Sequence, residues 1–131
     1  MITILVDHNI EWHADLLQGS LGASGWLDLA QIRFLRFAEV GLPTNSTDQE
    51  VWRFAQTNRM FLLTGNRNMK SDDSLETTIR KENCPTSLPV ITIGDADRIA
   101  DRIYREKCVE RLLEIVLYIE SCLGTGRLFI P

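Results

Sequence analysis

Three short apolar segments, separated by longer segments with helical spacing, constrain the fold of this chain more than any other feature. They are Ile2–Val6, residues 60–64 and Val90–Ile93. Short runs in which polar and apolar residues do not alternate are typical of strands buried on both faces. The sequence therefore predicts a three-layer α/β/α fold, in which right-handed crossovers join the strands of a mostly parallel central sheet.

Helical patterns fill the segments between these strands. The first helix is predicted from Ile10 onward, with Asn9 in a capping position and with Gly22 and Gly25 placed to end it. A further strand is expected within residues 27–37, where apolar residues recur in a mixed pattern. The chain thus opens with a strand, a helix and a second strand.

A second helix begins at a recognisable signal. Thr47 and Glu50 have the spacing of a capping box, in which each side chain accepts a hydrogen bond from the backbone of the other residue. Asp48 is therefore expected in the first turn of this helix. Further helices are predicted at residues 73–81 and 99–123, and an edge strand at residues 127–130.

Length and composition suit one globular domain that spans residues 1–131. No uncharged apolar stretch approaches the roughly 20 residues of a membrane-spanning helix. The N-terminus lacks the basic region of a secretory signal, so we expect a cytoplasmic protein that does not bind membranes. The formal charge of −4 argues against indiscriminate binding to nucleic acid. The cysteines, whose spacing fits neither a zinc site nor a disulfide framework, are expected to be reduced: Cys84, Cys108 and Cys122.

Polar side chains follow two of the predicted strands and open one helix. Asp7 comes directly after the first strand, Asn66 and Asn68 follow the strand at residues 60–64, and Asp48 opens a helix. Loops and helix N-termini converge at the carboxyl ends of parallel strands, where ligands usually bind. We therefore expect these side chains to meet at one edge of the sheet.

The order of these motifs resembles the PIN-like domain family, which includes small bacterial PIN-like proteins and toxin ribonucleases. The similar motifs are Leu-Val-Asp-His-Asn, Ser-Thr-Asp-Gln-Glu-Val and Leu-Leu-Thr-Gly-Asn-Arg-Asn, in that order. The third motif of the family usually reads Thr-x-Asp-x-Asp, so Asn66 and Asn68 stand here where acids are usual. The resemblance covers residues from Met1 to about Asp73 and continues loosely through the later strand and helix.

The resemblance implies a ribonuclease that hydrolyses phosphodiester bonds with Mg²⁺ or Mn²⁺. Asp7, Asp48 and Asn66 would be the catalytic residues, and the metal ligands would be these three with Asn68. Among these residues only Asp7 and Asp48 are carboxylates. Mg²⁺ commonly binds only one or two protein carboxylates and completes its coordination shell with water and phosphate oxygens. Three further residues would contact the substrate: Asn9, Arg67 and Lys70.

The implied partners are single-stranded RNA and, as in toxin–antitoxin pairs, a small antitoxin-like protein. An alternative is a catalytically degenerate PIN-like module that binds RNA or a protein partner without hydrolysis. Pairing of PIN-like domains and the apolar C-terminal segment Leu-Phe-Ile-Pro also favour a homodimer.

Each candidate ligand also has a structural explanation. Asp7 is placed to cap the turn that follows its strand, and Asp48 is attracted to the positive end of a helix. Asn68 suits a turn because asparagine tolerates left-handed backbone conformations. Asp72 and Asp73 are better explained as helix caps than as replacement metal ligands.

The remaining aromatic and basic residues are expected to have structural roles. Tryptophans among apolar neighbours are more often core residues than platforms for nucleobases, and His13 is expected to face solvent. The helical spacing of the basic residues suggests an RNA-binding stripe, but interleaved acids favour an ion-paired, solvated face. The residues concerned are Trp12, Trp26, Trp52, Arg98, Arg102 and Arg105.

Overall fold

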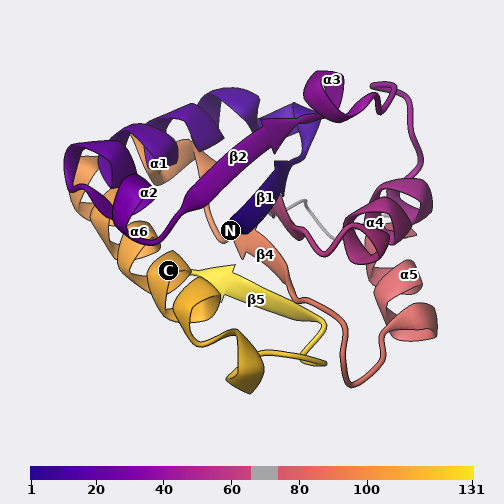
Figure 1. Ribbon diagram of the computed structural model, residues 1–131. Coiled ribbons are helices and arrows are strands. Elements are labelled where there is room, and N and C mark those ends of the chain that lie inside the picture. Colours follow the sequence, from indigo (N-terminus) through magenta and orange to yellow (C-terminus); the bar gives the residue numbers. More distant parts are fainter. Residues whose placement is uncertain (66–73) are drawn as a thin grey trace.

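The computed structural model describes residues 1–65 and 74–131 and has a parallel β-sheet at its centre (Figure 1). In the described part of the chain the sheet has five strands in the order β2-β1-β3-β4-β5, and every neighbouring pair is parallel. The predicted three-layer α/β/α fold is therefore confirmed. The strands are β1 (Ile2–Val6), β2 (Ile32–Arg36), β3 (Phe61–Gly65), β4 (Val90–Ile93) and β5 (Arg127–Ile130).

Helices cover both faces of the sheet (Figure 1). The α-helices of the described residues are α1 (Glu11–Ala23), α2 (Trp26–Leu29), α3 (Phe37–Val40), α4 (Asp48–Thr57), α5 (Ser74–Glu82) and α6 (Arg102–Leu117). The described residues also form three short 3-10 helices: η1 (His8–Ile10), η2 (Ala96–Ala100) and η3 (Ile119–Ser121). None of the helices among the described residues has the length and apolar character needed to cross a membrane.

The prediction that Asn9 caps the first helix is wrong. A 3-10 turn comes first, and the Asp7 side chain caps it by accepting a hydrogen bond from the backbone N–H of Asn9 at 3.4 Å. α1 then begins after Ile10 without a side-chain cap. Gly22 lies inside α1, whereas Gly25 adopts a left-handed conformation (φ 82°) just after it and fits the predicted stop.

The long final helix predicted from its apolar stripe is interrupted. Asp101 has an extended backbone conformation, and its carboxylate accepts hydrogen bonds from the N–H groups of Ile103 (2.9 Å) and Tyr104 (3.4 Å). This cap starts α6 afresh and leaves residues 96–100 as η2. The spacing of apolar residues indicates which side of a segment is buried. It does not show where the backbone leaves the helical conformation.

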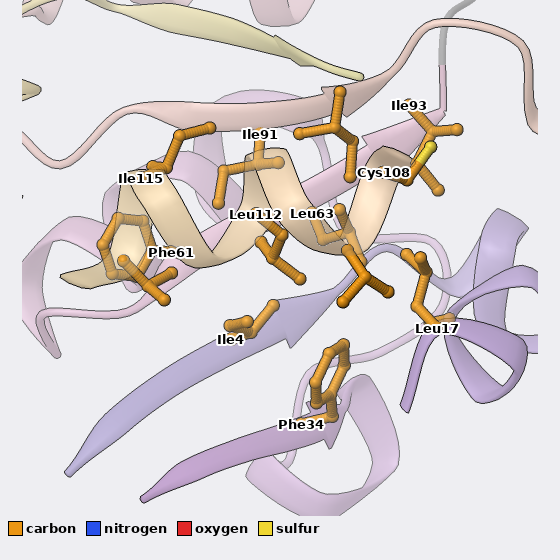
Figure 2. Close-up of a cluster of buried hydrophobic side chains, with 14 of the residues drawn as sticks. Ile4, Leu17, Phe34, Phe61, Leu63, Ile91, Ile93, Cys108, Leu112 and Ile115 are labelled. Carbon is orange, nitrogen blue, oxygen red and sulfur yellow. The ribbon is translucent and has the colours of Figure 1, made fainter. Parts of the chain in front are cut away.

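Two clusters of buried side chains fill the space on either side of the sheet. α1 and α6 pack on one face over strand residues such as Ile4, Leu63 and Ile91. Figure 2 shows part of this cluster, with Leu112 and Ile115 of α6 directed at the strands. α4 and α5 pack on the other face. Side chains of consecutive strand residues point to opposite faces, so Leu62 belongs to the second cluster while Leu63 belongs to the first.

One crossover has the opposite hand from its neighbour. The connections from β3 to β4 and from β4 to β5 step across the sheet in the same direction, yet α5 and α6 lie on opposite faces. The connection from β1 to β2 through α1 steps in the opposite direction from the β3–β4 connection through α5, and it also lies on the opposite face. These two crossovers therefore have the same handedness. The β4–β5 crossover through α6 has the opposite handedness. The expectation of uniformly right-handed crossovers is therefore wrong. α6 packs beside α1 on this face, in the cluster that contains Phe61, Leu63, Ile91 and Ile93.

The aromatic predictions hold only in part. Trp52 is buried as expected, and Trp26 packs partly buried against the core. Trp12 is 59% exposed, so its predicted place in the core is wrong, because its position on α1 faces away from the sheet. His13 is half-buried rather than solvent-exposed, and its ring meets the edge of Trp12 at a centroid distance of 4.9 Å.

The capping box at the start of α4 is present as predicted. The Thr47 hydroxyl accepts a hydrogen bond from the N–H of Glu50 at 3.1 Å, and Glu50 accepts one from Thr47. We expect Thr47→Ala to lower the free energy of unfolding by about 1 kcal/mol, because it leaves a helix N–H without this partner. Urea denaturation provides the measurement. Thr57→Ala at the exposed last position of α4 is the control, and equal losses in both variants would contradict the role of the cap.

Candidate functional site

The topology creates a crevice at the carboxyl edge of the sheet. From β1 the chain turns toward β2, and it returns past β1 to form β3 on the other side. Connections that diverge from adjacent strands in this way leave a gap above them, where α/β proteins bind ligands. The residues that follow β1 and β3 border this gap.

A pocket of about 180 Å³ lies at this point. Asp7 enters it from the end of β1 and Asp48 from the first turn of α4, so segments about 40 residues apart in the chain contribute a carboxylate each. Hydroxyl groups of Thr44, Ser46 and Thr64 add further oxygen atoms. The apolar part of the wall consists of Phe37, Val51, Leu62 and Leu75.

Asp7 is held firmly and is only 8% exposed. Its N–H donates to the carbonyl oxygen of Leu63 at 3.0 Å, which continues the pairing of β1 with β3. Its carboxylate accepts the N–H of Asn9, and the Nδ1 atom of His8 lies 3.7 Å from Oδ1. The main chain of Asp7 is therefore fixed against β3, and its carboxylate contacts the backbone of η1.

Asp48 is fixed by two helices. The Thr47–Glu50 capping box sets the start of α4, and Asp48 stands at its first helical position. From the start of α5, the hydroxyl group of Ser74 donates a hydrogen bond to Oδ2 of Asp48 at 2.5 Å. Sequence reasoning identified Asp48 but missed Ser74, because nothing in the local pattern links the starts of two helices.

A buried pair of hydroxyl groups lies beneath the pocket. Thr64 at the end of β3 and Thr92 on β4 are opposite each other in the sheet, and their Oγ1 atoms are 3.1 Å apart. Both are buried, and Thr64 also lines the pocket. Two threonines at matching strand positions were the available signal for this pair, but strand pairing is needed to recognise it.

The structure accounts for some of the predicted site residues. Asp7, Asp48 and Asn9 all line the one pocket, and Asn9 is exposed at its rim. The other predicted residues lie outside the described part of the chain: Asn66, Arg67, Asn68, Lys70, Asp72 and Asp73.

The oxygen donors suit a hard divalent cation. Mg²⁺ and Mn²⁺ prefer carboxylate, hydroxyl, carbonyl and water oxygens, which is the donor set of this pocket. Within residues 1–65 and 74–131, three or more His, Cys, Asp or Glu side chains do not gather into a metal-binding group. A cation here would therefore rely on Asp7 and Asp48 and fill its remaining positions with water and substrate oxygens.

The basic stripe is engaged within the protein, and Arg102 has the kind of ion pair that was expected. Arg102 forms an ion pair with Glu106 (Nε to Oε1, 3.0 Å). Arg105 donates to the hydroxyl of Ser20 at 2.9 Å and also to backbone carbonyl oxygens of η2. Arg98 lies over the ring of Tyr104 at 4.6 Å. These contacts favour a structural role over phosphate binding.

The cysteines differ in chemical character although all three are free thiols, as predicted. Hydrogen bonds from the hydroxyl groups of Ser87 and then Thr86 lower the pKa of exposed Cys84 to about 7. Burial raises the pKa of Cys108 to about 11. Cys84 lies away from the carboxylate pocket and is not among the residues that line it.

No protein-family model matches the sequence, and neither a curated protein nor a solved structure shows significant similarity to it.

Proposed function

We propose that this protein is a divalent-metal-dependent endoribonuclease of PIN-like type. The observation behind the proposal is that Asp7 and Asp48, from distant parts of the chain, line one small oxygen-rich pocket at the carboxyl edge of a parallel sheet. Two carboxylates in such a space repel the phosphates of RNA unless a cation lies between them. The arrangement therefore favours metal-assisted chemistry over direct binding of phosphate.

The size of the pocket supports a polymeric substrate. At about 180 Å³ it is smaller than the roughly 300–1,000 Å³ of pockets that enclose a whole small molecule. It has room for a hydrated cation and one phosphate group. The nucleotides on either side would lie on the protein surface, as expected for an enzyme that cuts within a chain.

The residues have distinct parts in this proposal. Asp7 and Asp48 would hold Mg²⁺ or Mn²⁺, and Asn66 and Asn68 are proposed as neutral oxygen donors. Once bound, the cation supplies a more acidic water and positive charge beside the phosphate. Ser74 positions the Asp48 carboxylate, and the fixed backbone at Asp7 keeps its oxygen atoms directed into the pocket. Asn9, Arg67 and Lys70 are proposed to contact the RNA strand.

A second candidate is the PIN-like module that binds without hydrolysis. It is favoured by the structural use of both carboxylates, since Asp7 caps η1 and Asp48 accepts the hydroxyl of Ser74. Such a module would bind single-stranded RNA or a small antitoxin-like protein over the same edge of the sheet.

Incubation of the purified protein with a fluorescently labelled single-stranded RNA separates the two candidates. With Mn²⁺ or Mg²⁺ we expect internal cleavage products that disappear when EDTA is added. We expect cleavage to depend on the cation because a cation is needed between the two carboxylates and the phosphodiester. Double-stranded RNA and single-stranded DNA of the same sequence define the substrate class. Binding of the RNA without cleavage, at equal affinity with EDTA, would favour the second candidate.

A further inference from the structure

An aromatic ring with exposed surface lines the carboxylate pocket. Of the described residues around this pocket, His8 and Phe37 are the aromatic ones. Phe37 is 3% exposed, whereas the side chain of His8 is 37% exposed. His8 is therefore the ring in this part of the chain that offers surface to a ligand in the pocket.

The ring of His8 is supported from two directions. It packs against Phe37, which belongs to the core cluster beneath α4 and α5, with the ring centroids 5.8 Å apart and the planes tilted by 44°. Its Nδ1 atom lies 3.7 Å from Oδ1 of Asp7. Asp7 also caps η1, the turn that carries His8. Because these contacts already position the ring, little conformational entropy is lost when a ligand stacks on it.

The described wall of the pocket offers RNA few contacts of favourable charge. The described residues of this wall include no Lys or Arg, and the whole chain has a formal charge of −4. A bound cation would attract one phosphate, so the remaining attraction along this wall has to come from uncharged contacts. Stacking of a base on an aromatic ring is such a contact, and it tolerates any base because every base has a π face.

The size of the pocket also favours a base on this ring. A hydrated cation and one phosphate group take up the space of about 180 Å³, so the adjoining base has to lie at the rim. The rim includes the exposed residues Asn9 and Thr44 together with the half-buried ring of His8. A base inside a duplex is already stacked and paired, whereas an unpaired base is free to turn onto a protein ring.

We propose that His8 is the platform on which the unpaired nucleobase next to the cation-bound phosphate stacks. This role rests on the proposed function or on its binding alternative, because both bring RNA to the carboxylate pocket. It adds a subsite for the base and a reason why a single strand binds in preference to a duplex. The role belongs to the ring face of His8, so a phenyl ring at this position should serve equally well.

Removal of one base at a time from the RNA tests the platform. Each short 2′-O-methyl RNA has one charged phosphodiester and otherwise neutral methylphosphonate linkages, so that the cation fixes its register on the protein. Ca²⁺ replaces Mg²⁺ because it takes the same oxygen ligands, and electrophoresis checks that the strands stay intact. Fluorescence anisotropy measures the dissociation constant. We expect an abasic nucleotide beside the charged phosphate to raise this constant roughly 10- to 100-fold.

Substitution of His8 should remove this dependence on the base. His8→Ala should weaken binding of the intact strand by the same factor, and it should bind the abasic strand no more weakly, because ring and base belong to one contact. His8→Phe keeps a ring and should bind like the unmodified protein, whereas His8→Asn keeps polar atoms and should behave like His8→Ala. His13→Ala is the matched control, since His13 is half-buried in α1 and does not line the pocket. Thermal midpoints verify that each variant folds.

The outcomes separate the platform from the proposed nuclease. If RNA is cleaved, His8→Ala should raise KM and leave kcat nearly unchanged, because stacking is equal in the ground and transition states. Equal binding with and without the base, or rescue by His8→Asn instead of His8→Phe, would overturn the platform and leave the nuclease proposal standing. Base-dependent binding without any cleavage would do the reverse. A protein that binds none of the strands would overturn both.

Discussion

Asp7→Asn is expected to abolish metal-dependent RNA cleavage, with a loss of roughly 1,000-fold or more in kcat/KM. Asparagine keeps the size of the side chain and an oxygen that accepts the N–H of Asn9, so η1 retains its cap. The negative charge that would hold the cation is lost. Initial rates at several Mn²⁺ concentrations measure the effect, and we expect saturating Mn²⁺ to recover little of the activity.

Asp28→Asn provides a matched control for this change. Asp28 is an exposed aspartate in α2, and it does not line the carboxylate pocket. It should leave the cleavage rate and the thermal midpoint unchanged. Asp48→Asn should behave like Asp7→Asn, because the proposal needs both carboxylates. Cleavage by Asp7→Asn at the unmodified rate would refute the proposed chemistry and leave the binding module as the remaining candidate.

Leu112→Ala is expected to lower the free energy of unfolding by about 3 kcal/mol, within the usual range for deletion of a buried leucine side chain. Leu112 is fully buried in α6, in the cluster that joins this helix to the sheet (Figure 2). The substitution leaves a cavity between α6 and the strands, and the rigid sheet relaxes little to fill it. Urea denaturation followed by circular dichroism measures the loss.

Leu117→Ala on the same helix is the control for this prediction. Leu117 is 44% exposed, so its removal should change the free energy of unfolding by less than about 0.5 kcal/mol. Similar effects of the two substitutions would mean that Leu112 of α6 is not buried against the sheet.

Features set by neighbouring residues were predictable from the sequence. The apolar runs identified β1 and β4 with correct bounds, and Thr47 with Glu50 identified the start of α4. Each depends on contacts within a few positions of the chain. The same local logic placed Asp7 at the carboxyl edge of the sheet, because it directly follows a buried strand, and Asp48 in the first turn of α4, because it follows the capping residue Thr47.

Features that depend on packing between distant segments were not predictable. α6 packs on the same face of the sheet as α1, and its apolar stripe would be the same on either face. Trp12 fits a core helix by residue type, yet its side chain on α1 is 59% exposed. The link from Ser74 to Asp48 joins positions 26 residues apart, and only the packing of α5 beside α4 brings them together.

The position of β5 at the edge of the sheet has a consequence during protein synthesis. β4 consists of four residues that are all buried in the finished fold, and β5, the last strand of this sequence, pairs with one of its sides. Until that strand leaves the ribosome, a nascent chain presents Val-Ile-Thr-Ile as an open edge, which is the kind of segment that initiates aggregation between chains. Early docking of α6 would shield one face of this segment but leave its unpaired backbone groups accessible.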